Sequence, residues 1–145
     1  MVERIVGKGR MAKIDAAKMW SLNYRLLMSV ITSVAPDIAK LGLETKELFV
    51  LAEIDDHPHP AELAAVLCMP KPTVTVNVKR LEAAGFVRRE IDASDLRRHR
   101  LMVTPAGRKV MTRGLAFLSE AFGERLRRLT AGQQADLRAL LEKLT

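Results

Sequence analysis

The chain has 145 residues and a formal net charge of +7 at pH 7, and 48% of its residues are hydrophobic. This length predicts a single domain over residues 1–145 with a buried core. One cysteine excludes an internal disulfide, and the longest apolar stretch, residues 26–34, is too short to span a membrane. The first residues carry charges at short intervals and lack the apolar segment of a signal peptide, so we expect a cytoplasmic protein.

The positive charge lies in the second half of the chain. Residues 1–70 contain 8 Lys and Arg against 9 Asp and Glu, whereas residues 71–145 contain 16 against 8. A basic region of this kind suits a polyanion such as nucleic acid, or an anionic membrane surface. A solvated basic surface would give the same count, so the fold has to decide between these interpretations.

The first part of the chain predicts two helices. The first runs over about residues 15–35 and ends before Pro36, since proline interrupts helices. Its apolar residues are too many for one narrow stripe, which indicates burial on more than one face. Glu44 or Thr45 caps a second helix, and a loop with two prolines and two histidines follows over residues 55–60.

The most specific pattern lies in residues 59–107. Pro60 opens a short helix, residues 68–70 break it, and a second helix follows and stops at a glycine cap, Gly85. Two runs suited to β-strands then flank a charged loop: residues 86–91 and 100–103. This order is a helix-turn-helix followed by a β-hairpin wing, an arrangement that fits one helix into the major groove of DNA.

Two apolar helices follow the wing. Thr104 caps the first, and Thr130 with Gln133 forms a capping box for the last. The predicted fold is mainly α with a small β-hairpin wing: a winged helix-turn-helix over about residues 43–107, between dimerisation helices over about 15–40 and 106–145. The simplest use of apolar helices at both ends is burial against a second copy; the alternative is that they cover only their own core. A two-fold dimer presents two reading helices to a palindrome with half-sites about 34 Å apart.

A helical wheel predicts which face of the second motif helix meets DNA. Val74, Val78 and Leu81 fall on the buried side, and Asn77 is expected as a polar residue at the core edge. The DNA-facing candidates are Lys71, Pro72, Thr73, Thr75, Val76, Lys79 and Arg80. The cations suit phosphates, which position a protein without reading sequence, whereas hydroxyls reach phosphates or base edges and Val76 packs against a thymine methyl.

The wing loop adds three candidates. Arg97 and Arg98 lie at a hairpin tip that suits the narrow minor groove, where the potential is most negative. Asp95 is expected to hold the guanidinium of Arg97 by a charge-assisted hydrogen bond, because an aspartate near DNA is otherwise repulsive. A solvated charged loop is the alternative.

Together these segments resemble the MarR family of bacterial regulators (multiple antibiotic resistance regulators). The similarity lies in ELA at residues 62–64, in TVT…RLEAAGFVRR over residues 73–89, and in the D…D-x-R…VTPAG of the wing and its exit. It is strong over residues 43–107, and the flanking helices match in length and position. The resemblance implies a triangular homodimer with winged-helix lobes, usually a repressor that small molecules or oxidants release from operator DNA. By position, the resemblance places Thr73, Thr75 and Val76 on the reading helix, and Asp95 and Arg97 at the wing tip.

Three positions depart from the family pattern. Pro70 stands where the family usually has a Ser or Asp cap, and Asn77 replaces a usual core aliphatic residue. Val76 stands where many members place an arginine that contacts bases. We therefore expect an operator preference that differs from theirs and depends on apolar contact and shape.

An enzyme is the first alternative function. Cys68 with His57 or His59 would supply a nucleophile and a base, but Cys68 follows an apolar helix face and is expected to be buried. The residues Asp55, Asp56, His57 and His59 offer metal ligands without the spacing of a structural zinc site. We expect no catalysis, no metal and no cofactor.

Two further alternatives keep the DNA-binding fold. A redox- or metal-responsive regulator is one, although oxidant-sensing relatives place a cysteine near the start of the first helix, where this chain has none. Cys68 instead lies beside the reading helix. An architectural protein that binds DNA without sequence choice is the other, and a specificity ratio over random DNA would reveal it.

An effector site is expected between the dimerisation helices and the winged helix, as the resemblance implies. Trp20, Tyr24 and Met28 are spaced i, i+4 and i+8 and share a helix face, so with Phe49 they are candidates to line it. Arg25 is the candidate contact for an anionic ligand. The expected partner is a small aromatic or anionic molecule, and the alternative for these side chains is dimer core.

Overall fold

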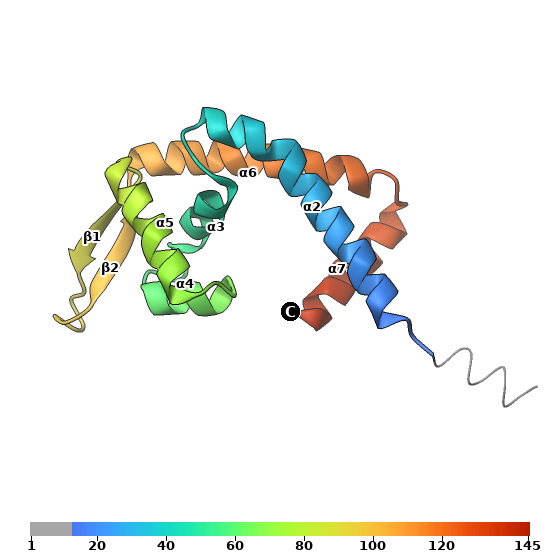
Figure 1. Cartoon of the computed structure of the whole chain (residues 1–145), viewed down its shortest axis with the longest axis horizontal. Coiled ribbons are helices and arrows are strands. Elements are labelled where there is room, and N and C mark those ends of the chain that lie inside the picture. Colours follow the sequence, from blue (N-terminus) through green and yellow to red (C-terminus); the bar gives the residue numbers. More distant parts are fainter. Residues whose placement is uncertain (1–12) are drawn as a thin grey trace, which may run out of the picture.

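The computed structural model describes residues 13–145. The elements are α2 (Ala16–Lys40), α3 (Thr45–Glu53), α4 (Pro60–Val66), α5 (Lys71–Ala83), β1 (Val87–Ile91), β2 (His99–Val103), α6 (Pro105–Leu126) and α7 (Ala131–Leu144). Figure 1 shows the long helix α6 with α3, α4, α5 and the hairpin gathered below one end, while α7 folds back at the other. This mainly helical fold with a β-hairpin wing confirms the predicted fold class.

The core fills the space between α3, α4, α5 and the hairpin. Its fully buried side chains are Ile38, Leu48, Val50, Leu51, Ile54, Leu63, Val74, Val78, Leu81 and Leu101. Burying one such side chain stabilises the fold by about 1.5–3 kcal/mol, so this cluster fixes the rotation of α5 about its axis. Within residues 13–145, no single helix has the length and apolar character needed to cross a membrane, although α2 and α3 pass that test together as a pair bent by 85°.

The helix α2 is longer than predicted. The Asp15 carboxylate accepts a hydrogen bond from the Lys18 N–H at 2.9 Å and caps the helix. The helix then continues through Pro36, whereas the sequence predicted an end at residue 35. Proline removes one backbone hydrogen bond, but Val34 and Ile38 on either side of it are buried in the core. That burial outweighs the missing bond and carries the helix onward.

The hairpin is joined to the body of the protein by its second strand. The strands pair antiparallel, with Val87 opposite Val103 and Ile91 opposite His99. The outer edge of β2 also pairs with the loop before α4, because the N–H of Leu101 donates to the carbonyl of Pro58 at 2.8 Å. The base of the wing therefore moves with the winged-helix core.

The segment between the wing and α6 is fixed by a close backbone contact. The Thr104 hydroxyl accepts from the N–H of Gly107 at 3.0 Å and donates to the carbonyl of Gly85 at 2.6 Å. The Thr104 N–H donates to the carbonyl of Phe86 at 3.0 Å. A Cβ on Gly107 would overlap that same Phe86 carbonyl, so only glycine fits. The start of α6 is thereby held against the end of α5.

Candidate DNA-binding interface

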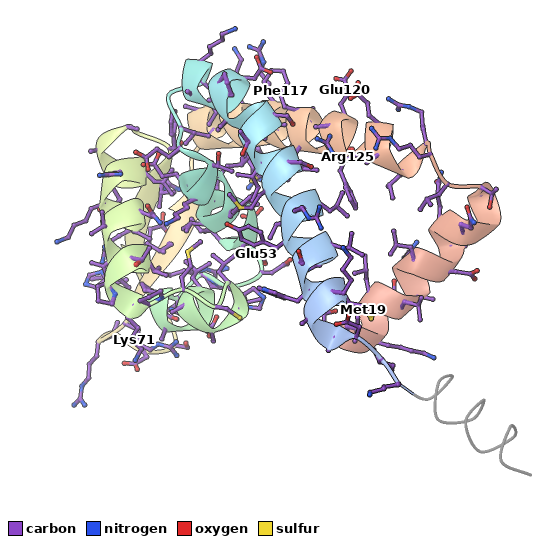
Figure 2. All side chains as sticks on the ribbon, turned by 45° about the vertical axis from the view of Figure 1, so that its right-hand side comes forward. Met19, Glu53, Lys71, Phe117, Glu120 and Arg125 are labelled. Carbon is purple, nitrogen blue, oxygen red and sulfur yellow. The ribbon has the colours of Figure 1, made fainter. Side chains whose placement is uncertain are left out.

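The helix α5 presents a polar and basic face to solvent. Val74 and Val78 are fully buried while Val76 is 49% exposed, which confirms the rotation predicted for this helix. Exposed beside Val76 are Lys71, Pro72, Thr75, Lys79 and Arg80, and Thr73 is half-buried. Figure 2 places Lys71 at the end of α5 that lies away from α6. The wing tip extends toward the same side, so the two elements form one surface.

The cations of α5 differ in what holds them. The guanidinium of Arg80 lies 3.2 Å from a carboxylate oxygen of Glu44 and 3.8 Å from one of Glu47, at the start of α3. It ties α5 to α3, and its predicted phosphate contact stays a prediction. Lys71 and Lys79 form no ion pair with any of residues 13–145. These two ammonium groups are therefore available to phosphates.

Asn77 lies on the buried flank of α5. Its side chain is 4% exposed, which confirms the predicted place at the core edge. The Nδ2 amide has no hydrogen-bond partner among the described residues. A buried donor without a partner costs about 1–3 kcal/mol, so this position lowers the stability of the packing around α5.

Replacing this amide tests that cost. Asn77→Val is expected to raise the free energy of unfolding by about 1 kcal/mol, because the desolvation cost removed exceeds the small helix penalty of a β-branched residue. Urea denaturation at equal chain concentration measures the change, with Asn77→Asp as the matched variant that is expected to destabilise. If Asn77→Val were less stable than the wild type, the assignment would be contradicted.

Aspartates shape the wing loop. One carboxylate oxygen of Asp92 accepts from the Ser94 N–H at 2.9 Å and from the Ser94 hydroxyl at 2.7 Å. These hydrogen bonds, with smaller contributions from the charges of His59 and Arg98, hold the pKa of Asp92 below its ordinary value. Because the pKa of this carboxyl is lowered, ionised Asp92 stabilises the turn at any pH above the ordinary carboxyl pKa. The turn loses this support as the pH falls through the lowered pKa.

Asp95 has a different role from the predicted one. Its carboxylate accepts from the backbone N–H of Arg97 at 3.0 Å, and its carbonyl accepts from the N–H of Arg98 at 3.0 Å. A spacing of two residues suits this Asx turn better than a bridge to a long side chain. The expected hydrogen bond to the Arg97 guanidinium is therefore wrong in this structure, and Asp95 positions the loop backbone.

Arg97 is the outward-facing cation of the wing tip. The guanidinium of the neighbouring Arg98 lies 3.7 Å from a carboxylate oxygen of Glu62 on α4. That of Arg97 forms no ion pair within the part of the chain that the structure describes, and the adjacent Leu96 is 81% exposed. The wing tip therefore presents Arg97 to solvent beside the exposed face of α5, without an ion-pair partner among residues 13–145, whereas the exposed Arg98 is paired with Glu62.

The sequence and the fold match known regulators. Residues 41–98 match the MarR family. The chain is 31% identical over 136 residues to the HTH-type transcriptional repressor Rv2887 of Mycobacterium tuberculosis, with 92% of this chain and 98% of that protein covered. The chain belongs to the MarR family of transcriptional regulators. The transcriptional regulator HosA of Escherichia coli is also 31% identical, over 111 residues that cover 75% of this chain and 78% of that protein.

Solved structures of Rv2887 share this MarR-family fold. Its complex with DNA aligns with a TM-score of 0.69 at 30% identity, covering 86% of this chain and 94% of that chain. Its complex with p-aminosalicylic acid aligns with a TM-score of 0.70 at 30% identity, covering 86% of this chain and 95% of that chain.

An open cavity of about 480 Å³ lies between α2, α3, α6 and α7 of this MarR-family chain. Its lining is almost wholly apolar and includes Leu26, Leu27, Val30, Ile31, Phe49, Leu115, Leu118 and Phe122. Of the five residues predicted for an effector site, Phe49 lines this cavity. Trp20, Tyr24 and Met28 lie exposed on α2 outside the lining. Since α2 is apolar on more than one face, the sequence did not show which face turns toward α6.

Arg25 lines a neighbouring hollow that shares Leu26, Phe122 and Leu137 with the apolar cavity. Two further arginines of α6 and its end line it, Arg125 and Arg128. The guanidinium of Arg125, which is labelled in Figure 2, donates to the Ser29 carbonyl at 3.1 Å and so joins α6 to α2. The fifth predicted residue therefore lies beside the cavity and not within it.

The residues of the alternative functions do not come together. The thiol of Cys68 is exposed and not buried as predicted, because the residue ends α4 in a left-handed conformation with φ of 51°. The Asp55 carboxylate accepts two hydrogen bonds from the guanidinium of Arg108, and Nε2 of His57 lies 3.9 Å from a carboxylate oxygen of Glu53. His59 turns toward the wing. In the described part of the chain, no group of three or more His, Cys, Asp or Glu side chains is arranged to hold a metal ion.

Proposed function

We propose that this chain is a homodimeric repressor that binds a palindromic operator and is released by a small-molecule effector. The observation that carries the proposal is the surface formed by the exposed face of α5 and the wing tip with Arg97. In the proposed complex α5 occupies the major groove and Arg97 the adjacent minor groove. Repression is supported by the relative Rv2887, which is named a transcriptional repressor.

The side chains of α5 divide into two roles at DNA. Lys71 and Lys79 neutralise phosphates and set affinity, while Thr73, Thr75 and Val76 face base edges. Val76 offers only methyl groups, which favour contact with a thymine methyl over hydrogen bonds to guanine. The predicted preference is thus an AT-containing position opposite Val76 in each half-site.

Dimerisation is supported by apolar side chains that the single chain leaves exposed. The helix α7 has no buried residue of its own, and Leu140 and Leu144 are 56% and 82% exposed. On the first half of α2, Trp20 and Leu22 are 66% and 53% exposed. Monomeric proteins rarely expose so many large apolar side chains together. These helices lie away from the wing (Figure 1), so a second copy can cover them without blocking α5.

The cavity supports release by an aromatic acid. An apolar chamber beside Arg25, Arg125 and Arg128 fits a ligand with an aromatic ring and a carboxylate, since the ring fills the chamber and the carboxylate meets a guanidinium. The relative Rv2887 has been solved in complex with p-aminosalicylic acid, which is a ligand of this class. A ligand wedged between α2 and α6 changes the spacing of the two lobes and hence of the two reading helices.

Selection of bound sites from a random DNA pool with the full chain tests the proposal. We expect a two-fold symmetric motif, two chains per site by sedimentation, and affinity at least about a thousandfold above random DNA at the same salt. Addition of p-aminosalicylic acid is expected to weaken the complex. One chain per site, or a specificity ratio near unity, would contradict the proposal and favour an architectural protein.

A further inference from the structure

His59 lies where the loop after α3, the start of α4 and the wing meet. It is the residue that precedes the first turn of α4, yet its side chain makes no capping hydrogen bond. Ser, Thr, Asp and Asn are preferred at this position because their oxygens accept from the free N–H groups of the helix. The imidazole of His59 turns instead to the wing.

Both ring nitrogens of His59 face acceptors. Nε2 lies 3.1 Å from a carboxylate oxygen of Asp92, and Nδ1 lies 3.3 Å from the backbone carbonyl oxygen of His99. The side chains of His59 and Asp92 are both only 13% exposed. A neutral imidazole has one N–H and one lone pair, so it can donate to only one of these two oxygens. The imidazolium has two N–H groups and satisfies both.

The two acceptors flank the loop that carries Arg97. Asp92 follows β1 directly, and His99 is the first residue of β2. The loop between them is closed by the Asp92 N–H, which donates to the Arg98 carbonyl at 2.9 Å. One side chain of the body thus holds both ends of the wing loop at once.

We propose that His59, with both ring nitrogens protonated, is a positioning residue that fixes the wing for DNA, so that operator affinity depends on pH through this histidine. The inference rests on the proposed DNA-binding function. The positioning is full when the ring is charged. It is lost when one ring nitrogen gives up its proton, because the neutral ring leaves one of the two oxygens without a donor.

The Asp92 carboxylate is the charged partner of the His59 ring, 3.1 Å from Nε2, while the positive end of α4 opposes a cation at its first turn. Arg98 on the wing and Glu62 on α4 lie 3.7 Å apart and largely cancel each other. The other histidines are separate groups, since His57 pairs with Glu53 and the side chain of His99 is exposed.

The first test uses the free full chain and does not involve DNA. Nitrogen NMR of the histidine rings at pH 6 is expected to show Nδ1 and Nε2 of His59 both protonated. The hydrogen-exchange protection factors of the Asp92 and Leu101 amides, corrected for intrinsic exchange, should fall as the ring loses its proton. A ring with one proton at pH 6, or wing amides with unchanged protection, would overturn the proposal.

The second test measures affinity for the DNA site that the wild type selects, at pH 6, 7 and 8 and constant salt. The wild type is expected to lose roughly three- to tenfold in affinity, the worth of one modest charge-assisted hydrogen bond. His59→Gln should bind like the wild type at pH 8 and stay flat. The matched variants His57→Gln and His99→Gln should keep the wild-type profile.

A wild-type profile in His59→Gln would overturn the assignment, because the pH dependence would then come from another group. Enrichment of no DNA site by the wild type would contradict the proposed function, while the NMR test would still decide whether His59 anchors the wing.

Discussion

Arg97→Ala is expected to weaken operator binding by about ten- to a hundredfold, the usual worth of one lost arginine contact to DNA. The side chain is exposed at the tip of the wing and forms no ion pair with residues 13–145, so its loss removes no packing. Within residues 13–145, Arg97 is held by its backbone N–H, which donates to Asp95 and which alanine keeps. The fold should therefore be intact, with an unchanged midpoint of thermal unfolding.

The matched control for Arg97→Ala is Arg113→Ala. Arg113 is an exposed cation on α6, which lies on the side of the molecule away from the wing tip (Figure 1). Both variants lose one positive charge, so any difference in affinity reports a local contact and not the net charge. If Arg97→Ala bound the operator with wild-type affinity at physiological salt, the predicted contact between Arg97 and DNA would be contradicted.

Deletion of residues 130–145 is expected to convert the proposed dimer into a monomer or an insoluble chain. The deletion removes the whole of α7, in which no residue is fully buried. The apolar side chains lost with it are Leu137, Leu140, Leu141 and Leu144. Because Leu140 and Leu144 stay exposed in the single chain, a second copy is the partner proposed to cover them. Operator affinity should fall steeply, since two half-sites held by one dimer act at high effective concentration and two monomers do not.

Two full-length variants distinguish an effect on the dimer interface from an effect of shortening the chain. Leu140→Glu with Leu144→Glu places two charges on the apolar face and should dissociate the dimer at micromolar concentration in sedimentation runs. Arg138→Ala leaves the leucines of α7 unchanged, removes the pair that Arg138 forms with Glu142 at 2.9 Å, and should leave the dimer intact. A truncated chain that still sediments as a stable dimer would show that α7 is not its interface.

The winged helix-turn-helix could be predicted because its signals are local. Pro60 at a helix start, Gly85 after a helix end and Thr104 before Pro105 each fix the backbone within one turn, and the structure has each of them as predicted. The buried face of α5 followed from the spacing of Val74 and Val78, which only one rotation of the helix can hide.

The sequence did not predict features set by distant contacts. The helix α2 continues past Pro36 because Ile38 is buried in the core. The residues near Pro36 in the sequence do not indicate that burial. Cys68 was expected inside because it follows apolar residues, but its position after the helix end turns it outward. The contact between His59 and Asp92 joins residues far apart in the chain, and the only sequence signal was a histidine at a capping position.

The most direct test of the central claim is selection of sites from random DNA with the wild type and Val76→Arg side by side. If α5 reads base edges, the arginine should change the preferred base to guanine at one position in each half-site, with roughly 1–3 kcal/mol of discrimination. Lys79→Ala serves as the control, because loss of a phosphate contact should weaken all sequences alike and reduce the salt slope by about one. Identical motifs from wild type and Val76→Arg would contradict the claim, since residue 76 would then not face the bases.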